Sequence, residues 1–347
     1  MKKLNRKKFL SLTAAVALTL SLAACSGGTA SSPSPSASAP AGSAPAAGEG
    51  CKVAVVKQLD HASMDEIANA ITGRLDEIAA EKGAEITYQV FSGQNDQSTL
   101  TQIGSQIVAD GYSAIVPIGT LAAQVMVVAA EDSKTPVIFA AVSDPAYNDL
   151  TGIDYLTGTS DALNTEFILD MMLAQNPDTA KVGLLYSKSE TNSATPIAEA
   201  KTYLDGKGIA YVEATANTND EVIAAASSLI ADGVDAVFTP TDNVVMAAEL
   251  AIYEDLAAAG IPHYTGADSF VRNGAFATCG VNYTDLGAQT ADLVEQALSA
   301  GMDGLEDFYK VSGGIITVNT ETAAALGADY SVFADMGDLV EVTTTAE

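Results

Sequence analysis

The sequence is poor in the residues that bind metals and nucleic acids. Its 347 residues include two histidines, three cysteines and no tryptophan. So few Cys and His residues leave little material for a zinc site. The 16 basic residues face 44 acidic ones, for a net charge of -28, and such a surface repels nucleic acid and anionic lipid headgroups. We therefore expect neither metalloenzyme chemistry nor nucleic-acid binding.

Motifs of catalysis are also missing. The chain has no Gly-x-Ser-x-Gly elbow, no Walker loop and no His-Glu-x-x-His pair. Asp60 and His61 are adjacent, but no nucleophile stands beside them in a recognisable context. The prediction is a protein that is not an enzyme and needs no cofactor or metal. Cys51 precedes the first expected strand and Cys279 ends a distant one, so we expect both to be free thiols.

The first 24 residues have the pattern of a secretory signal. Five basic residues among residues 2–8 precede the apolar stretch 9–22, which is too short to span a bilayer as a stable helix. The segment LAAC at 22–25 resembles a bacterial lipobox, in which Cys25 would receive the lipid. The sequence thus predicts a signal peptide over 1–24 and an extracytoplasmic protein, lipid-anchored to the cell membrane through Cys25.

Residues 25–50 form a segment dominated by Ala, Ser, Pro and Gly, with one charged residue, Glu49. Such a composition cannot bury a core and predicts a disordered tether. About 25 residues of random coil reach roughly 25 to 30 Å. A body on this tether can move near the membrane while it stays attached.

From Lys52 onward, short apolar runs alternate with longer helical patterns, which is typical of a parallel sheet covered by helices. The first expected strands are 53–56, 86–91, 114–118 and 137–141. The helices expected between them are 65–81, 98–110 and 121–131, where apolar residues recur at helical spacing.

An internal repeat indicates that this α/β unit occurs twice. The segment SQIVADGYSAIVPIGT at 105–120 aligns with SSLIADGVDAVFTPTD at 227–242. Lys82-Gly83 and Lys207-Gly208 precede matching strands, and further landmarks follow in the same order. The predicted fold class is α/β, with two similar doubly wound lobes of parallel sheet.

Ligands of such sheets bind at the carboxyl ends of the strands. The strand-to-helix loops of both copies are short and polar, and they include residues 58–63, 119–122, 143–147, 187–193, 239–244 and 266–270. If the lobes face each other, these loops converge on one cleft, and its closure buries a small molecule.

Six stretches of the chain carry a family resemblance. They are DHASMD at 60–65, QNDQSTL at 94–100, AVSDP at 141–145, ETNS at 190–193, PTDN at 240–243 and DLGAQT at 285–290. With them the chain resembles the extracytoplasmic solute-binding proteins of ABC importers, of the type I periplasmic-binding fold. It is most similar to the subgroup that binds tryptophan, tyrosine or phenylalanine.

The resemblance implies a monomer that delivers an aromatic amino acid to an ABC permease in the membrane. It also implies three crossings between the lobes, which act as hinges. Lobe one would comprise residues 51–158 and about 283–305. Lobe two would comprise residues 159–282 and about 306–347.

The expected cleft is acidic, which favours a ligand with an amino group. Four acids lie in its loops, namely Asp144, Glu190, Asp242 and Asp268. A ligand carboxylate would be held by helix N-termini and hydroxyl or amide groups, for which the candidates are Thr120, Ser143, Asn192 and Asn243. His61 lies in the first loop, and Tyr283 is placed to stack on an aromatic ring. Because no helix start is evident near Asp268, this acid is a favoured partner for the ammonium.

Thr, Ser, Asp and Asn also begin helices, so each candidate has an alternative role as a helix cap. Other functions stay open as well. The chain is also compatible with a ligand-sensing module for a membrane receptor, with a hydrolase that uses paired carboxylates, or with transport of a sugar or nucleoside.

Overall fold

The computed structural model describes residues 50–345 and contains two β-sheets. The predicted signal peptide, Cys25 and all of the tether but Gly50 lie outside the described residues. Within 50–345, no helix is long and apolar enough to cross a membrane.

The first sheet has six strands in the order β11-β5-β4-β3-β1-β2, and every neighbouring pair is parallel. The strands are β1 (Cys51–Lys57), β2 (Ile86–Ser92), β3 (Ala114–Ile118), β4 (Val137–Phe139), β5 (Leu156–Ser160) and β11 (Tyr309–Lys310). The central strand β3 is buried along its whole length. This agrees with its unbroken apolar sequence, since a parallel strand is covered on both faces.

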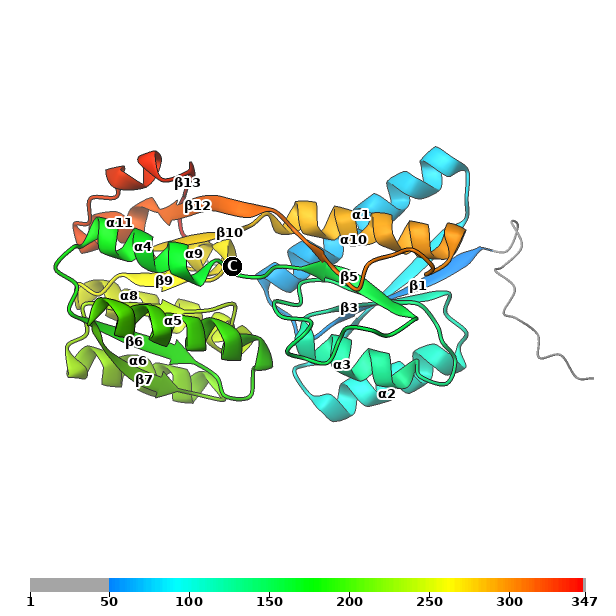
Figure 1. Ribbon diagram of the computed structural model, residues 1–347, viewed down its shortest axis with the longest axis horizontal. Helices are drawn as coiled ribbons and strands as arrows, with labels where there is room; N and C mark the ends of the chain where they lie inside the picture. Colours follow the sequence, from blue (N-terminus) through cyan, green and yellow to red (C-terminus); the bar gives the residue numbers. More distant parts are fainter. Residues whose placement is uncertain (1–49, 346–347) are drawn as a thin grey trace, which may run out of the picture. The chain divides into compact units, whose positions relative to one another are not determined.

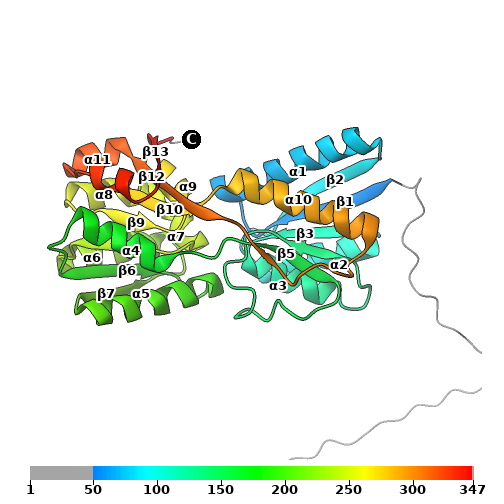
Figure 2. The same ribbon diagram turned by 45° about the horizontal axis from the view of Figure 1, so that its top comes forward.

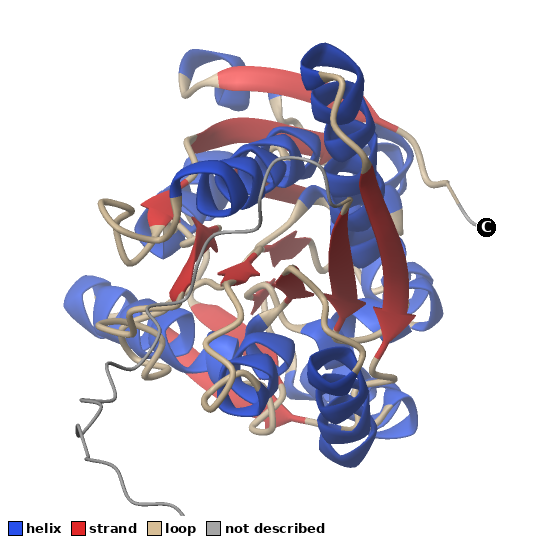
Figure 3. Cartoon of the chain, turned by 90° about the vertical axis from the view of Figure 1, so that its right-hand side faces the viewer, coloured by secondary structure: helices blue, strands red, loops and turns tan. Residues whose placement is uncertain are grey.

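Helices cover both faces of this sheet, as Figure 3 shows for the molecule seen from one end. They are α1 (Ala62–Lys82) and α10 (Tyr283–Ala300) on one face and α2 (Gln97–Ala109) and α3 (Thr120–Ala129) on the other. Val53 and Val55 of β1 pack into the core cluster beneath α1, whereas Ala54 and Val56 pack into the cluster beneath α2 and α3. Alternate residues of one strand therefore stabilise two layers.

The second sheet has seven strands in the order β13-β12-β10-β9-β8-β6-β7. They are β6 (Lys181–Tyr186), β7 (Ala210–Thr215), β8 (Ala236–Thr239), β9 (His263–Thr265), β10 (Ala277–Val281), β12 (Gly313–Asn319) and β13 (Asp338–Val342). All neighbours are parallel except β10 and β12. The antiparallel pair arises because β12 enters this sheet from the opposite lobe.

Helices also flank the second sheet. On one face lie α4 (Thr165–Gln175), α5 (Ala194–Lys207), α11 (Thr320–Leu326) and the short helix η3 (Ser331–Asp335). The other cluster gathers α6 (Asn219–Asp232), α7 (Asn243–Ala248), η2 (Glu249–Ala251), α8 (Tyr253–Ala258) and α9 (Asp268–Arg272). The predicted fold class of two doubly wound α/β lobes is confirmed.

The chain passes between the sheets three times, after β5, after β10 and after β11 (Figures 1 and 2). Tyr309 and Lys310 belong to the first sheet, where they pair with Thr159 and Ser160. The family resemblance implied instead that all four of these residues belong to lobe two, but β5 and β11 are both strands of the first sheet. A two-residue strand has no apolar pattern of its own, so nothing in the sequence marks the true crossing point.

Local backbone features explain where two elements begin and end. The side chain of His61 accepts a hydrogen bond from the Met64 amide, so α1 begins at Ala62, three residues before the expected start. Strand β4 ends at Phe139 instead of continuing to Ala141, because Ala141 has a positive φ of 54°. Both differences lie at the edge where the strands lead into the cleft.

Candidate functional site

The carboxyl ends of the strands from both sheets meet at one cavity. Its lining residues are His61, Ser63, Met64, Ile67, Gly119, Thr120, Ala141, Ser143, Asp161, Asn192, Thr241, Asp242, Asn243, Met246, Ala267, Phe270 and Tyr283. The free space between these side chains is about 30 Å³. Because one water molecule needs about 10 to 15 Å³ by this measure, an amino acid can enter only if the lobes or side chains move apart.

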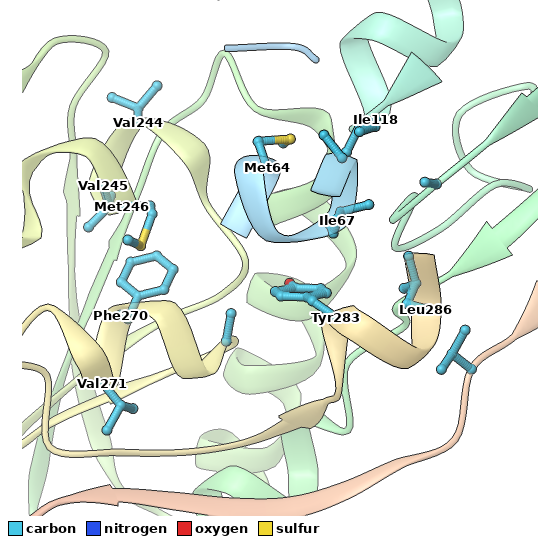
Figure 4. Close-up of a cluster of buried hydrophobic side chains, with 14 of the residues drawn as sticks. Met64, Ile67, Ile118, Val244, Val245, Met246, Phe270, Val271, Tyr283 and Leu286 are labelled. Atoms are coloured by element: carbon cyan, nitrogen blue, oxygen red, sulfur yellow. The ribbon is translucent and has the colours of Figure 1, made fainter. Parts of the chain in front are cut away.

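Four apolar side chains line part of the cavity. Met64 and Ile67 reach it from α1, Met246 from α7 and Phe270 from α9. Figure 4 shows Met246 beside the ring of Phe270, and the ring of Tyr283 near Ile67. An aromatic ring, a methionine and a branched side chain form a surface that suits a flat apolar group.

Asp161 is one of two buried acids in the cavity lining. It follows β5 at the first crossing between the lobes and is 5 % exposed. Its carboxylate accepts hydrogen bonds from Ser143 Oγ at 2.9 Å and Tyr283 OH at 3.2 Å. Burial raises the pKa of this carboxyl, and the two hydrogen bonds oppose the shift.

Thr120 begins helix α3 and also lines the cavity. It is 2 % exposed, and its Oγ1 has no hydrogen-bond partner among the described residues. The residue before it, Gly119, has a φ of 93° and supplies no side-chain cap. A buried hydroxyl and a helix start without a side-chain cap thus border the cavity together.

Asp242 is surrounded by donors. One carboxylate oxygen accepts from the amides of Val244 and Val245, and the other accepts from the Ser187 amide and Ser193 Oγ, each at 2.7 Å. The residue is fully buried and forms the N-cap of α7. With four donors already satisfied, its carboxylate has little capacity left for a ligand.

Four polar side chains form a chain across the cleft. Gln58 donates to Glu190 at 3.1 Å, Asn243 donates to the other oxygen of Glu190 at 2.7 Å, and His61 Nε2 lies 3.0 Å from Asn243 Oδ1. Gln58 and His61 belong to the first lobe, whereas Glu190 and Asn243 belong to the second. Burial raises the pKa of Glu190, with the charge of Asp242 as the second cause, and burial lowers the pKa of His61.

Three further contacts join the lobes directly. Ser63 bonds Ser269, Ser143 Oγ lies 3.1 Å from Thr241 Oγ1, and Thr195 donates to Asp144 at 2.7 Å. Hydrogen bonds between facing loops require the lobes to be close. The cleft is therefore closed in this arrangement.

The sequence profile of the family described as ABC transporter substrate binding protein matches residues 52–331. The chain belongs to this family. The tyrosine-binding protein of Clostridioides difficile (strain R20291) is 27 % identical over 279 residues, which are 79 % of this chain and 80 % of that protein.

Two solved structures are similar to this chain in sequence and fold. An ABC domain from Streptococcus pneumonia in complex with L-Trp is 26 % identical, with a TM-score of 0.76 over 84 % of this chain and all of that one. A ligand-free, open substrate-binding protein with adhesive properties from Clostridium difficile is also 26 % identical, with a TM-score of 0.64 over 85 % of this chain and all of that one. The lower score against the open structure agrees with the closed cleft described above.

Most of the predicted site residues of this substrate-binding protein lie together. The cavity lining contains His61, Thr120, Ser143, Asn192, Asp242, Asn243 and Tyr283. Asn192 lies there with its amide bonded to the Thr241 carbonyl oxygen at 2.5 Å. Glu190 lies immediately behind the lining, where it accepts from Asn243 and Gln58.

Two predicted residues lie away from the cavity. Asp144 is not in the lining and accepts from the Tyr147 amide and from Thr195. Asp268 is partly exposed and pairs with Arg272 at 3.2 Å. The expectation that no helix starts near Asp268 is wrong, because α9 begins at this residue. Its five residues are too short to produce a helical pattern in the sequence.

Sequence reasoning missed Asp161 and the apolar side chains of the lining. Asp161 directly follows a buried strand, which is the signal that identified the other loops, but the sequence LTGTS of strand 156–160 has no apolar run to reveal it. Met64 and Phe270 were hidden because an apolar residue that lines a cavity has the same pattern as one in the core. Among residues 50–345, no cluster of His, Cys, Asp or Glu is arranged to hold a metal ion, and Cys51 and Cys279 are free.

Proposed function

We propose that this substrate-binding protein captures an aromatic amino acid between its lobes and delivers it to an ABC importer in the membrane. The observation that carries the proposal is the composition of the cavity. Phe270, Met246 and Ile67 line the cavity with apolar side chains, while Asp161 and Thr120 present buried polar groups to the same space. An aromatic amino acid has this division between an apolar ring and a charged end.

The relatives support the same ligand class. One has the name tyrosine-binding protein and another was solved with L-Trp. A sugar or nucleoside hydroxyl group that faces Met64, Met246 or Phe270 would instead lack a hydrogen-bond partner, which is unfavourable.

We also propose that Cys25 carries the lipid anchor. The support is the sequence alone, in which the basic residues, the apolar stretch and the segment LAAC follow one another directly. Replacement of Cys25 by Ala should release a folded protein from the membrane fraction, whereas Cys51→Ala should leave it attached. Unchanged membrane association of the Cys25 variant would contradict the anchor.

A thermal-shift screen tests the ligand class. The purified protein is heated with each of the twenty amino acids and with a panel of sugars and nucleosides. We expect the largest rise in Tm with Tyr, Phe or Trp, because a ligand at 100 times its Kd stabilises the folded state by about 2.7 kcal/mol. Mass spectrometry of small molecules released from denatured protein provides an independent readout. No shift with any amino acid, together with a shift from a sugar or nucleoside, would overturn the proposal.

A further inference from the structure

Asp161 lacks the positive charge that a buried carboxylate needs. No Lys, Arg or His nitrogen of the described residues lies within 4.0 Å of it. The one basic residue in the cavity lining is His61, and burial lowers its pKa and so favours the neutral imidazole. Two hydroxyl donors alone do not offset the removal of a carboxylate from water. The cavity thus has a place for a cation next to Asp161.

Thr120 marks a place for an anion. Its hydroxyl is buried without a partner among the described residues, although buried polar groups normally form hydrogen bonds. It stands at the N-terminus of α3, a helix of ten residues, where the helix dipole and free backbone amides favour a negative charge. The amide of Leu121 is already bonded to Gln58 Oε1, so Thr120 Oγ1 is the side-chain donor that remains free.

The sheet sets the distance between these two places. Asp161 follows β5 and Thr120 follows β3, and β4 lies between these strands. Neighbouring strands are about 4.8 Å apart, so the two strand ends are separated by roughly 10 Å. One α-amino acid group with a hydrogen bond of about 2.9 Å at either end spans this separation. Ser143, from the loop after β4, lies beside Asp161.

We infer that the cavity binds an α-amino acid in one fixed direction, with its ammonium on Asp161 and its carboxylate on Thr120 and the N-terminus of α3. This inference rests on the proposed function and assigns the charge recognition to the first lobe. Asp242 then serves as a helix cap, and the acid that selects for an amino group is one that sequence reasoning did not identify. The ligand's side chain points toward Phe270 and Met246 of the second lobe.

This arrangement selects against close analogues. A deaminated acid leaves Asp161 buried without a partner, and an amine leaves Thr120 and the helix start without an anion. A site that hydrogen-bonds a polar group rejects ligands that lack the group much more strongly than an apolar pocket rejects a missing methylene.

Calorimetry with three ligand series tests the inference. Each of L-Tyr, L-Phe and L-Trp is compared with its amine, which lacks the carboxylate, and with its deaminated acid, which lacks the ammonium. In the wild-type protein we expect both analogues of the best ligand to bind at least about 100-fold more weakly, the order of the loss when one partner of a desolvated charge pair is removed.

Variants assign each loss to a residue. Asp161→Asn should lower amino-acid affinity about 100-fold while leaving the affinity for the deaminated acid unchanged or higher. Thr120→Val should lower amino-acid affinity about 10-fold and leave the affinity for the amine unchanged. Asp303→Asn, at an exposed position, is the control and should bind like the wild type. Circular dichroism checks the fold.

The outcomes separate the inference from the proposed function. Wild-type protein that binds none of the three amino acids overturns both. If an amino acid binds but folded Asp161→Asn retains affinity within threefold, the assignment of the ammonium is wrong and the function stands. If Asp161→Asn does not fold, equal wild-type affinity for an amino acid and its deaminated acid still overturns the assignment.

Discussion

At the scale of single residues, the environment of each acid determines its role. Asp242 and Asp161 are both buried at the cavity. Asp242 accepts from four donors, whereas Asp161 accepts from two hydroxyl groups. The number of donors, not the residue type, separates a structural carboxylate from one with capacity for a ligand.

The capping role of Asp242 predicts a large loss of stability on truncation. Asp242→Ala leaves two helix amides, the Ser187 amide and the Ser193 hydroxyl without their acceptor. Because each of the four buried donors left unsatisfied costs about 1 to 3 kcal/mol, we expect a loss of roughly 4 kcal/mol or more in the free energy of unfolding, measured with urea. Asp303→Ala should change it by less than about 0.5 kcal/mol. Equal stability of the two variants would refute the capping role.

The buried Glu190 predicts a dependence of stability on pH. Its pKa is raised from 4.5 to about 7 in the folded protein, by burial and then by the charge of Asp242. Between these two pH values the folded state holds a proton that the unfolded state has lost, so the free energy of unfolding falls as pH rises through this window. Glu190→Gln should flatten the fall in Tm between pH 4.5 and 7.

The exposed side chain of Glu131 provides the matched control, and Glu131→Gln should retain the wild-type profile. A Glu190→Gln profile that is superimposable on that of the wild type would mean that another group, such as Asp161, accounts for the dependence.

At the scale of elements, α1 packs extensively against α10 in the first lobe. Gly287 of α10 allows this approach, because a Cβ there would lie 2.6 Å from Ala70 Cβ and 2.9 Å from the Ile67 carbonyl oxygen. Both helices also reach the cavity, α1 through Ile67 and α10 through Tyr283. Their packing thus positions part of the site.

Two glycine substitutions test this contact. Gly287→Ala should destabilise the protein by about 1 to 3 kcal/mol, since the helices must separate. Gly73→Ala lies in α1, where a new Cβ meets nothing within 4 Å, and it should stabilise the protein by up to about 1 kcal/mol through helix propensity. Chemical denaturation measures both changes. A stabilising Gly287→Ala would show that helix propensity, not packing, dominates at Gly287.

At the scale of the whole molecule, the two lobes share one cleft and three crossings. The hydrogen bonds across the cleft exist only when the lobes are closed, so they contribute to ligand affinity through the closing step. Contacts within a lobe persist in both states and affect stability instead.

Two threonines separate these effects. Thr195 donates to Asp144 across the cleft, whereas Thr165 donates to Glu199 within the second lobe, each at 2.7 Å. Thr195→Val should weaken ligand binding about 5- to 10-fold, which corresponds to roughly 1 kcal/mol for one hydrogen bond. Thr165→Val should lower Tm and leave ligand affinity unchanged. Calorimetry and thermal unfolding of both variants distinguish the two effects. Unchanged ligand affinity in Thr195→Val would show that the hydrogen bond between Thr195 and Asp144 does not contribute to closure.

The sequence by itself determined the two-lobe α/β fold and most of the loops at the site. Apolar runs, helical spacing and the repeat of 105–120 at 227–242 are local patterns, and parallel sheets place successive loops at one edge. The loop residues His61, Thr120, Ser143 and Asn243 could therefore be predicted from these patterns. Local patterns carry no information about which groups become partners across the chain.

Only the tertiary structure decided which of these residues have capacity for a ligand. The four donors around Asp242 come from segments up to 55 residues away, and Asp161 meets Tyr283 across 122 residues. The cation that Asp161 lacks and the acceptor that Thr120 lacks are likewise properties of three-dimensional packing. A carboxylate's role follows from the number and charge of its neighbours, and folding brings those neighbours together from distant parts of the sequence.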